Sequence, residues 1–313
     1  MRRRRLLAGA AAAATLLGAV AAAPSRTPVS GAGLTVAAAI EIGGTPSGLA
    51  AAASAVWVAT GRDGVVRIDP ATDRVVLRLR PGGAVTALAA GFGDLWAIDA
   101  VGDRLLRIDP RANRILASLP VGRLPTGLAV GHGRVWVVSQ LDSTVVGIDP
   151  RTSRVAASRP FPYGELWPGG LAAARDGVWL ITGRGAEVTR LDARTAAVER
   201  RIPVEGARTL AAAGSLVWVG RAGGRPLVRI ADGDVVAVGF SGRGAQDGRG
   251  PKLATNASVW VAGRGRLASY TADGEPELSV RLTTSGRVAG VAVLGHDVWL
   301  ADEAGRVLRI RAR

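Results

Sequence analysis

Tryptophan recurs along this 313-residue chain at nearly constant intervals. Seven of its eight tryptophans follow one another at spacings of 39, 40, 43, 39, 42 and 39 residues, and a Leu or Val stands eight residues before each of them, or seven in the sixth copy. These seven are Trp57, Trp96, Trp136, Trp179, Trp218, Trp260 and Trp299. A steady period of about forty residues is typical of proteins in which each repeat is one supersecondary unit. The chain is therefore predicted to contain seven copies of one unit.

The third copy shows the unit most clearly. Four short apolar runs occupy residues 127–130, 135–138, 144–148 and 154–157, and clusters containing Gly, Asp or Ser separate them. Runs this short, rich in Val and Ile and bounded by turn residues, indicate strands rather than helices. We name the four strands A to D and expect Asp149-Pro150 to form the tight C–D turn. Four antiparallel strands in each unit predict an all-β, seven-bladed β-propeller.

The last repeat ends after its third strand, at residues 307–310, so it lacks a D strand. Residues 34–42 precede the first A strand and read like the D strand of the third repeat. We expect this N-terminal strand to pair with the C-terminal blade, because closing the ring removes the unpaired sheet edges that invite aggregation. The propeller is thus predicted to span residues 34–313.

The first 33 residues have a different character from the repeats. Arg2 to Arg5 form a basic start, residues 6–23 carry no charge, and small residues near position 20 suit a cleavage site. This pattern predicts a signal peptide over residues 1–23, followed by a disordered Pro/Ser/Gly linker over 24–33. We expect an exported protein that is secreted, periplasmic or on the cell surface, with membrane attachment only if the segment stays uncleaved. The Sec and Tat routes both remain open.

Composition excludes several kinds of chemistry. The chain has no cysteine and only two histidines, so disulfides, thiolate sites and multi-histidine metal centres are not expected, and no cofactor is predicted. His132 and His296 are expected to be solvated in A–B turns. The net charge of +15 attracts polyanions such as cell-wall polymers. Because that charge is dispersed over a chain predicted to be exported, we expect no binding of nucleic acid.

The repeats carry a family resemblance. Residues 104–122, followed by Pro-Thr-Gly-Leu-Ala-Val at 125–130, resemble the YVTN-type propeller repeat, and the same start with Val-Trp-Val at 135–137 is similar to virginiamycin B lyase-like propellers. The resemblance implies a seven-bladed fold. The lyases of that family depend on a histidine and glutamates at the channel mouth. Asp302, three residues after Trp299, is a partial match, but no histidine falls in an A strand.

Ligands of propellers are expected on the face where the D–A and B–C loops gather around the channel. One enlarged D–A connection, residues 161–170, carries Phe161, Tyr163 and Trp167, and Trp167 is the eighth tryptophan. These aromatics can form a stacking platform for a sugar, a peptide or another ring. The alternative is that they fold onto the neighbouring blade and only pack.

A second long connection, the glycine-rich loop at 241–250, leads to Lys252. Arg208 and Lys252 begin the A strands of blades five and six, so both are expected to point toward the axis. Further arginines stand on B–C loops, namely Arg184, Arg221 and Arg264. Together they can form a basic mouth suited to an anionic ligand. Independent, solvated surface arginines are the alternative.

These observations leave three hypotheses. The first is an exported, non-catalytic propeller that binds an unknown protein, a cell-wall polymer or a small anionic ligand at its loop-rich face, with no catalytic residue. The second is a lyase or hydrolase of the virginiamycin B lyase-like type that uses Asp302 and Glu303 at the channel mouth as acids or metal ligands. The third is a purely structural or assembly role.

Overall fold

A computed structural model describes residues 34–223, 227–238, 251–256, 258–263, 266–271, 273–281 and 287–312. In this part of the chain the elements are strands β1 to β28 and one short 3₁₀ helix, η1 (Gly183–Gly185). The expectations for residues 1–33, for the 241–250 loop and for Arg264 lie outside the described residues. Among the described residues, no helix has the length and apolar character needed to cross a membrane.

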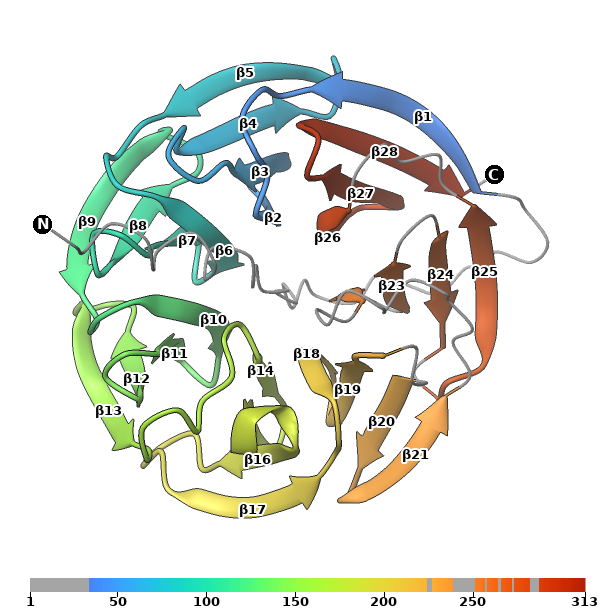
Figure 1. Cartoon of the computed structure of the whole chain (residues 1–313). Coiled ribbons are helices and arrows are strands. Elements are labelled where there is room, and N and C mark those ends of the chain that lie inside the picture. The colour runs from blue at the N-terminus through green and yellow to red at the C-terminus, as the bar shows by residue number, and fades with distance from the viewer. Residues whose placement is uncertain are drawn as a thin grey trace, which may run out of the picture.

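The strands form seven four-stranded antiparallel sheets that surround a common axis (Figure 1). Blade one contains β2 (Gly48–Ala52), β3 (Ala55–Ala59), β4 (Val65–Asp69) and β5 (Arg74–Leu79). Blade two contains β6 (Val85–Gly91), β7 (Asp94–Asp99), β8 (Arg104–Asp109) and β9 (Arg114–Pro120). Blade three contains β10 (Pro125–Gly131), β11 (Arg134–Ser139), β12 (Thr144–Asp149) and β13 (Arg154–Pro160). Blade four contains β14 (Leu171–Ala174), β15 (Gly177–Thr182), β16 (Glu187–Leu191) and β17 (Val198–Pro203).

The remaining blades follow the same order from the axis outward. Blade five contains β18 (Ala207–Ala213), β19 (Leu216–Arg221), β20 (Leu227–Ala231) and β21 (Asp234–Val238). Blade six contains β22 (Lys252–Thr255), β23 (Val259–Gly263), β24 (Arg266–Tyr270) and β25 (Pro276–Arg281). Blade seven contains β26 (Val288–Leu294), β27 (Asp297–Asp302), β28 (Arg306–Ala312) and β1 (Leu34–Glu41). The predicted seven-bladed propeller is confirmed.

The N-terminal strand closes the ring as predicted. Strand β1 pairs antiparallel with β28 along its whole length, from Leu34 opposite Ala312 to Glu41 opposite Arg306, so the first strand lies beside the last (Figure 1). Ile40, just before the end of this strand, is buried in a core cluster with Trp299 of blade seven. The last blade thus gains its fourth strand from the other end of the chain.

The seven repeated tryptophans pack between neighbouring blades. All lie in B strands and are at most 7% exposed. In blades one, two, four and seven, an arginine of the adjacent C strand is paired directly with the tryptophan and lies over its ring, and these arginines are Arg67, Arg107, Arg190 and Arg309. Blade three has Gly147 at that register position, and Arg134 covers the ring instead. A Cβ at Gly147 would approach the Trp136 ring to 2.9 Å, so glycine is required there.

Arg309 also joins the last blade to the first. Its guanidinium lies 5.3 Å from the Trp299 ring centroid, pairs with Asp297 of its own blade and reaches Asp73 of blade one at 3.0 Å. The same group donates to the carbonyl of Pro70. Only 14% of the Arg309 side chain is exposed, so water screens these charges weakly. The seam of the ring is therefore held by an ion-pair network in addition to β1.

This network yields a prediction with a matched control. Arg67 occupies the same register position in blade one, covers Trp57 at 5.9 Å and makes no ion pair with any described residue. We expect Arg309→Met to lower the free energy of unfolding by about 2–4 kcal/mol, because Asp73 loses its ion pair and the buried Asp297 keeps only Arg311. Arg67→Met should cost about 1 kcal/mol or less, because it removes a cation–π contact. Urea unfolding of both variants tests this, and equal losses would contradict it.

Candidate functional site

The two faces of the propeller carry different connections. The D–A and B–C loops lie on one face, which we call the loop face, and the A–B and C–D turns lie on the other. His132 and His296 both fall in A–B turns and are exposed, as predicted. His132 is not solely solvated, because its Nε2 atom contacts the carbonyl of Ala174, the last residue of β14 in blade four, at 2.5 Å. Both imidazoles are therefore remote from the loop face.

Aspartates close the loops of blades two and three. The fully buried carboxylate of Asp99 accepts hydrogen bonds from the backbone N–H groups of Ala84 and Gly102 and from the guanidinium of Arg104. In blade three, Asp142 accepts from the backbone and the side chain of Arg123. Each carboxylate ties a B–C loop to the D–A loop beside it.

Asp302 anchors the B–C loop of blade seven. Its side chain is fully buried. One oxygen accepts from the backbone N–H groups of Ala304 and Arg306, both at 3.1 Å, and the other accepts from the Arg306 guanidinium at 2.9 Å. The adjacent Glu303 is half-buried. Asp302, which the sequence predicts as a ligand contact, therefore has its carboxylate hydrogen-bonded within its own loop. Among the described residues, no three His, Asp or Glu side chains gather where they could hold a metal ion.

Blades four and five lack this aspartate. The B–C loop of blade four is Gly183-Arg184-Gly185-Ala186, and that of blade five begins with Ala222-Gly223. Three residues after its tryptophan, blade five has Arg221, whose Nε donates to the carbonyl of Glu205 at 2.8 Å. This bond and the Ala222 N–H, which donates to the carbonyl of Gly206 at 2.8 Å, join the B–C loop of blade five to its D–A loop without a carboxylate.

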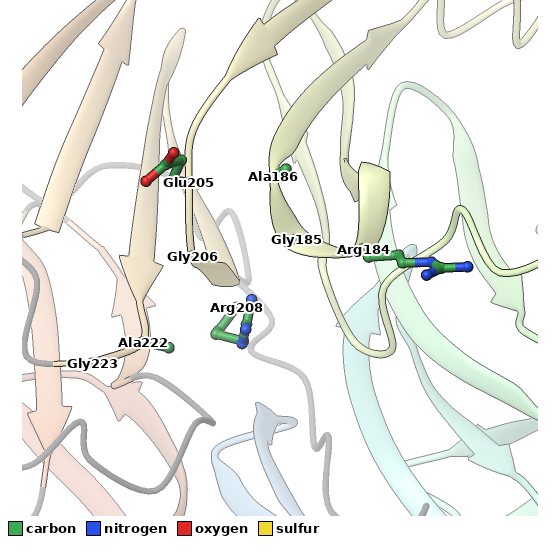
Figure 2. Close-up of a pocket in the computed structure, with 8 residues that line it drawn as sticks. All are labelled: Arg184, Gly185, Ala186, Glu205, Gly206, Arg208, Ala222 and Gly223. Atoms are coloured by element: carbon green, nitrogen blue, oxygen red, sulfur yellow. The ribbon is translucent and has the colours of Figure 1, made fainter.

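A pocket of about 420 Å³ opens at this point on the loop face. Its lining consists of Arg184, Gly185, Ala186, Glu205, Gly206, Arg208, Ala222 and Gly223. These residues come from the B–C loops of blades four and five and from the connection between the two blades. Figure 2 shows Arg208 in the space between the loops, whereas the side chain of Arg184 extends away from it. We call this cavity the blade 4/5 pocket.

Three contacts orient Arg208 at the start of β18. Its guanidinium carbon lies 4.1 Å from the ring centroid of Trp167, at the distance of close cation–π stacking. Its Nη1 donates to the carbonyl of Ala207 at 2.7 Å. Gly185, with φ of +89°, lies so close that a Cβ there would clash with Nη1. The sequence predicted Arg208 as a ligand contact, and the structure places it in the lining of the pocket.

The aromatic loop does not form a single stacking platform. Phe161 is only 8% exposed and packs in the core of blades three and four, because its backbone N–H is fixed to the carbonyl of Ser143. Tyr163 points to solvent and is 80% exposed. Trp167 is half-buried against the core of blades four and five and supports Arg208. Phe161 therefore contributes packing, and of the three aromatics it is Trp167 that contacts Arg208 of the pocket.

The predicted basic mouth is also divided. Lys252 is 7% exposed in the first position of β22 and does not line the pocket, because the converging A strands enclose it. Arg221 is half-buried and bound to Glu205. Arg184 lines the pocket with its backbone and directs its charge elsewhere (Figure 2). Of the described basic candidates, Arg208 is the one whose charged group faces the cavity.

Sequence reasoning missed the small residues that shape the pocket. Five of its eight lining residues are Gly or Ala, namely Gly185, Ala186, Gly206, Ala222 and Gly223, and Glu205 is also among the eight. The missing aspartate in the B–C loops of blades four and five was a visible signal. The sequence alone does not show that the aspartates of other blades join loops, so the meaning of this missing aspartate became clear only from the structure.

Comparisons with known proteins show the fold. No family model and no curated protein matches the chain. A streptogramin B lyase structure superposes with a TM-score of 0.76 at 15% identity, covering 90% of this chain and 98% of that one. A catalytically inactive His-to-Ala variant of virginiamycin B lyase from Staphylococcus aureus, with quinupristin, gives 0.72 at 14%, covering 85% and 94%. Hydrazine synthase from Kuenenia stuttgartiensis gives 0.71 at 14%, covering 85% and 95%. The resemblance to virginiamycin B lyase-like propellers is thus confirmed for the fold.

The closed loops predict a pH dependence. Burial raises the pKa of Asp99, but hydrogen bonds from Ala84, Gly102 and Arg104 outweigh it and hold the pKa below its usual value. Such a group stabilises the fold above its unfolded pKa of about 3.9, and this contribution is lost as the pH falls through the folded pKa. We therefore expect Asp99→Asn to lower stability at neutral pH and to flatten the loss of stability on acidification.

The measurement is the urea midpoint at about pH 7 and about pH 3, which lie above and below the unfolded pKa of about 3.9. Asp273→Asn serves as the control, because 87% of the Asp273 side chain is exposed and its contact with Arg229 is long, at 3.7 Å. The control should retain the wild-type difference between the two midpoints. An unchanged difference in Asp99→Asn as well would contradict the role of Asp99.

Proposed function

We propose that this protein is an exported, non-catalytic propeller that binds a small ligand in the blade 4/5 pocket. The observation that carries the proposal is the contrast between loops. In blade two and in blade three, an aspartate joins the B–C loop to the D–A loop beside it. Between the loops of blades four and five there is instead a pocket that contains an oriented guanidinium. An open pocket into which one oriented polar group points offers a contact for a small molecule.

The size of the cavity supports a small molecule over a polymer. At about 420 Å³ it lies within the range of typical ligand pockets. Its wall is built largely from Gly and Ala, so a ligand can approach the backbone closely. A polymer would need an extended groove, and the cavity is confined to the loops of two neighbouring blades.

A lyase activity is the second candidate, and the similarity to two lyase structures favours it. The same propeller architecture occurs in proteins with unrelated activities, so the fold alone does not decide. The inactive Staphylococcus aureus variant has alanine in place of a histidine. In this chain both histidines lie on the face opposite the loops, and Asp302 is held by its own loop. Binding without catalysis is therefore the better-supported function.

The absence of cysteine from the sequence allows a direct test. Ala222→Cys places a single thiol in the wall of the pocket, and Ala112→Cys places one in an exposed C–D turn on the opposite face as a control. Purified variants are labelled with a maleimide in the presence of small carboxylates, phosphates, sugars or quinupristin. We expect one class of compound to slow labelling of the first thiol and not of the second.

Two results would contradict the proposed function. The first is that no compound protects the thiol of Ala222→Cys, or that every compound that does also protects that of Ala112→Cys. The second is turnover of quinupristin by the unmodified protein, detected as a product by mass spectrometry. That result would favour the lyase candidate.

A further inference from the structure

We propose that the ligand of the blade 4/5 pocket is a small organic carboxylate and that Arg208 binds it through both arms of its guanidinium. This inference rests on the proposed function, because it requires that the pocket bind a small molecule. It adds the chemical class of the ligand and the residue that recognises it.

The orientation of Arg208 is the first argument. Guanidinium groups recognise carboxylates by two parallel hydrogen bonds in one plane, which requires a fixed plane. The Trp167 ring at 4.1 Å fixes the face of the Arg208 guanidinium, and the bond from Nη1 to the carbonyl of Ala207 fixes its rotation. An arginine ordered before binding loses less side-chain entropy when the ligand arrives. The pocket thus presents a prepared site for two oxygens.

Gly185 is the second argument. Its φ of +89° belongs to the left-handed region that favours glycine, and a side chain there would displace the guanidinium. The B–C loop of blade four therefore adopts a conformation that leaves room for Arg208. The neighbouring Arg184 has φ of 58° and directs its side chain away, so it does not compete for the same space (Figure 2).

The charges around the cavity favour a carboxylate over a phosphate. Phosphate sites usually combine several N–H donors from a helix N-terminus or a nest of backbone amides. Here Arg208 is the described cation that faces the cavity, and Glu205 adds a negative charge to the lining. The small Gly and Ala residues of the wall leave room for a compact apolar body behind the carboxylate.

The test compares benzoate with benzamide, which has the same ring and no charge, and with inorganic phosphate. Protection of the thiol in Ala222→Cys is measured as a function of concentration, which gives a Kd for each probe. We expect benzoate to bind at least about tenfold more tightly than benzamide, because a factor of this size is usual for the contribution of a charge-assisted hydrogen bond. Phosphate should bind more weakly than benzoate.

Substitutions that keep the positive charge then locate the contact. Arg208→Lys removes the fork and should raise the Kd for benzoate roughly 10- to 100-fold. Arg62→Lys, an exposed arginine on the loop face of blade one, is the matched control and should leave the Kd unchanged. Trp167→Leu retains Arg208 but removes its support, so it should weaken benzoate binding by a smaller factor. Circular dichroism verifies the fold of each variant.

The outcomes separate this inference from the proposed function. Three results would overturn the carboxylate assignment and leave the pocket as a binding site. They are equal protection by benzoate and benzamide, tighter binding of phosphate than of benzoate, and a larger rise of the Kd for benzoate in Arg184→Lys than in Arg208→Lys. If no probe and no compound of the wider panel protects the thiol, the proposed function itself fails. The assignment would be supported if Arg208→Lys folds and binds benzoate much more weakly, while Arg62→Lys keeps the wild-type Kd for benzoate.

Discussion

The packing of one tryptophan between each pair of neighbouring blades is the interaction on which the rest of the structure depends. Each blade alone exposes two sheet faces, and the indoles fill the space between sheets that diverge from the axis. In most blades an arginine of the C strand covers the ring, and at the seam Arg309 extends this contact into blade one. Seven interfaces of this kind require a closed ring, which explains why the chain supplies its missing strand from residues 34–41.

Because packing between blades carries the stability, the loops on one face are free to differ. In blades two and three, Asp99 and Asp142 join the B–C loop to the D–A loop, and in blade seven Asp302 anchors its own B–C loop. Blades four and five use it differently, with glycines and with an arginine held by Trp167. The candidate site is thus a local departure from the repeat. In a scaffold of nearly identical units such a departure is easy to recognise, and it costs little stability because the packing between blades is unchanged.

Sequence patterns predicted the features that depend on local periodicity. The tryptophan spacing gave the number of blades, the incomplete last repeat gave the closing strand, and the register placed His132 in a turn away from the loops. The site depends on contacts between distant segments, and there the predictions were less complete. The three aromatics of one loop separate, because Phe161 packs inward while Tyr163 faces solvent. Nothing local indicates that Trp167 orders Arg208, which lies in the next blade.

We propose the pocket between blades four and five as a ligand site because no aspartate bridges its loops and an oriented arginine lines it. A crystal structure of the protein soaked with benzoate tests this most directly. The account predicts density for the ring in the blade 4/5 pocket, with both carboxylate oxygens within hydrogen-bonding distance of the Arg208 guanidinium and the guanidinium still stacked on Trp167. Benzoate bound elsewhere on the loop face while this pocket stays empty, or a pocket filled by the protein's own side chains, would contradict it.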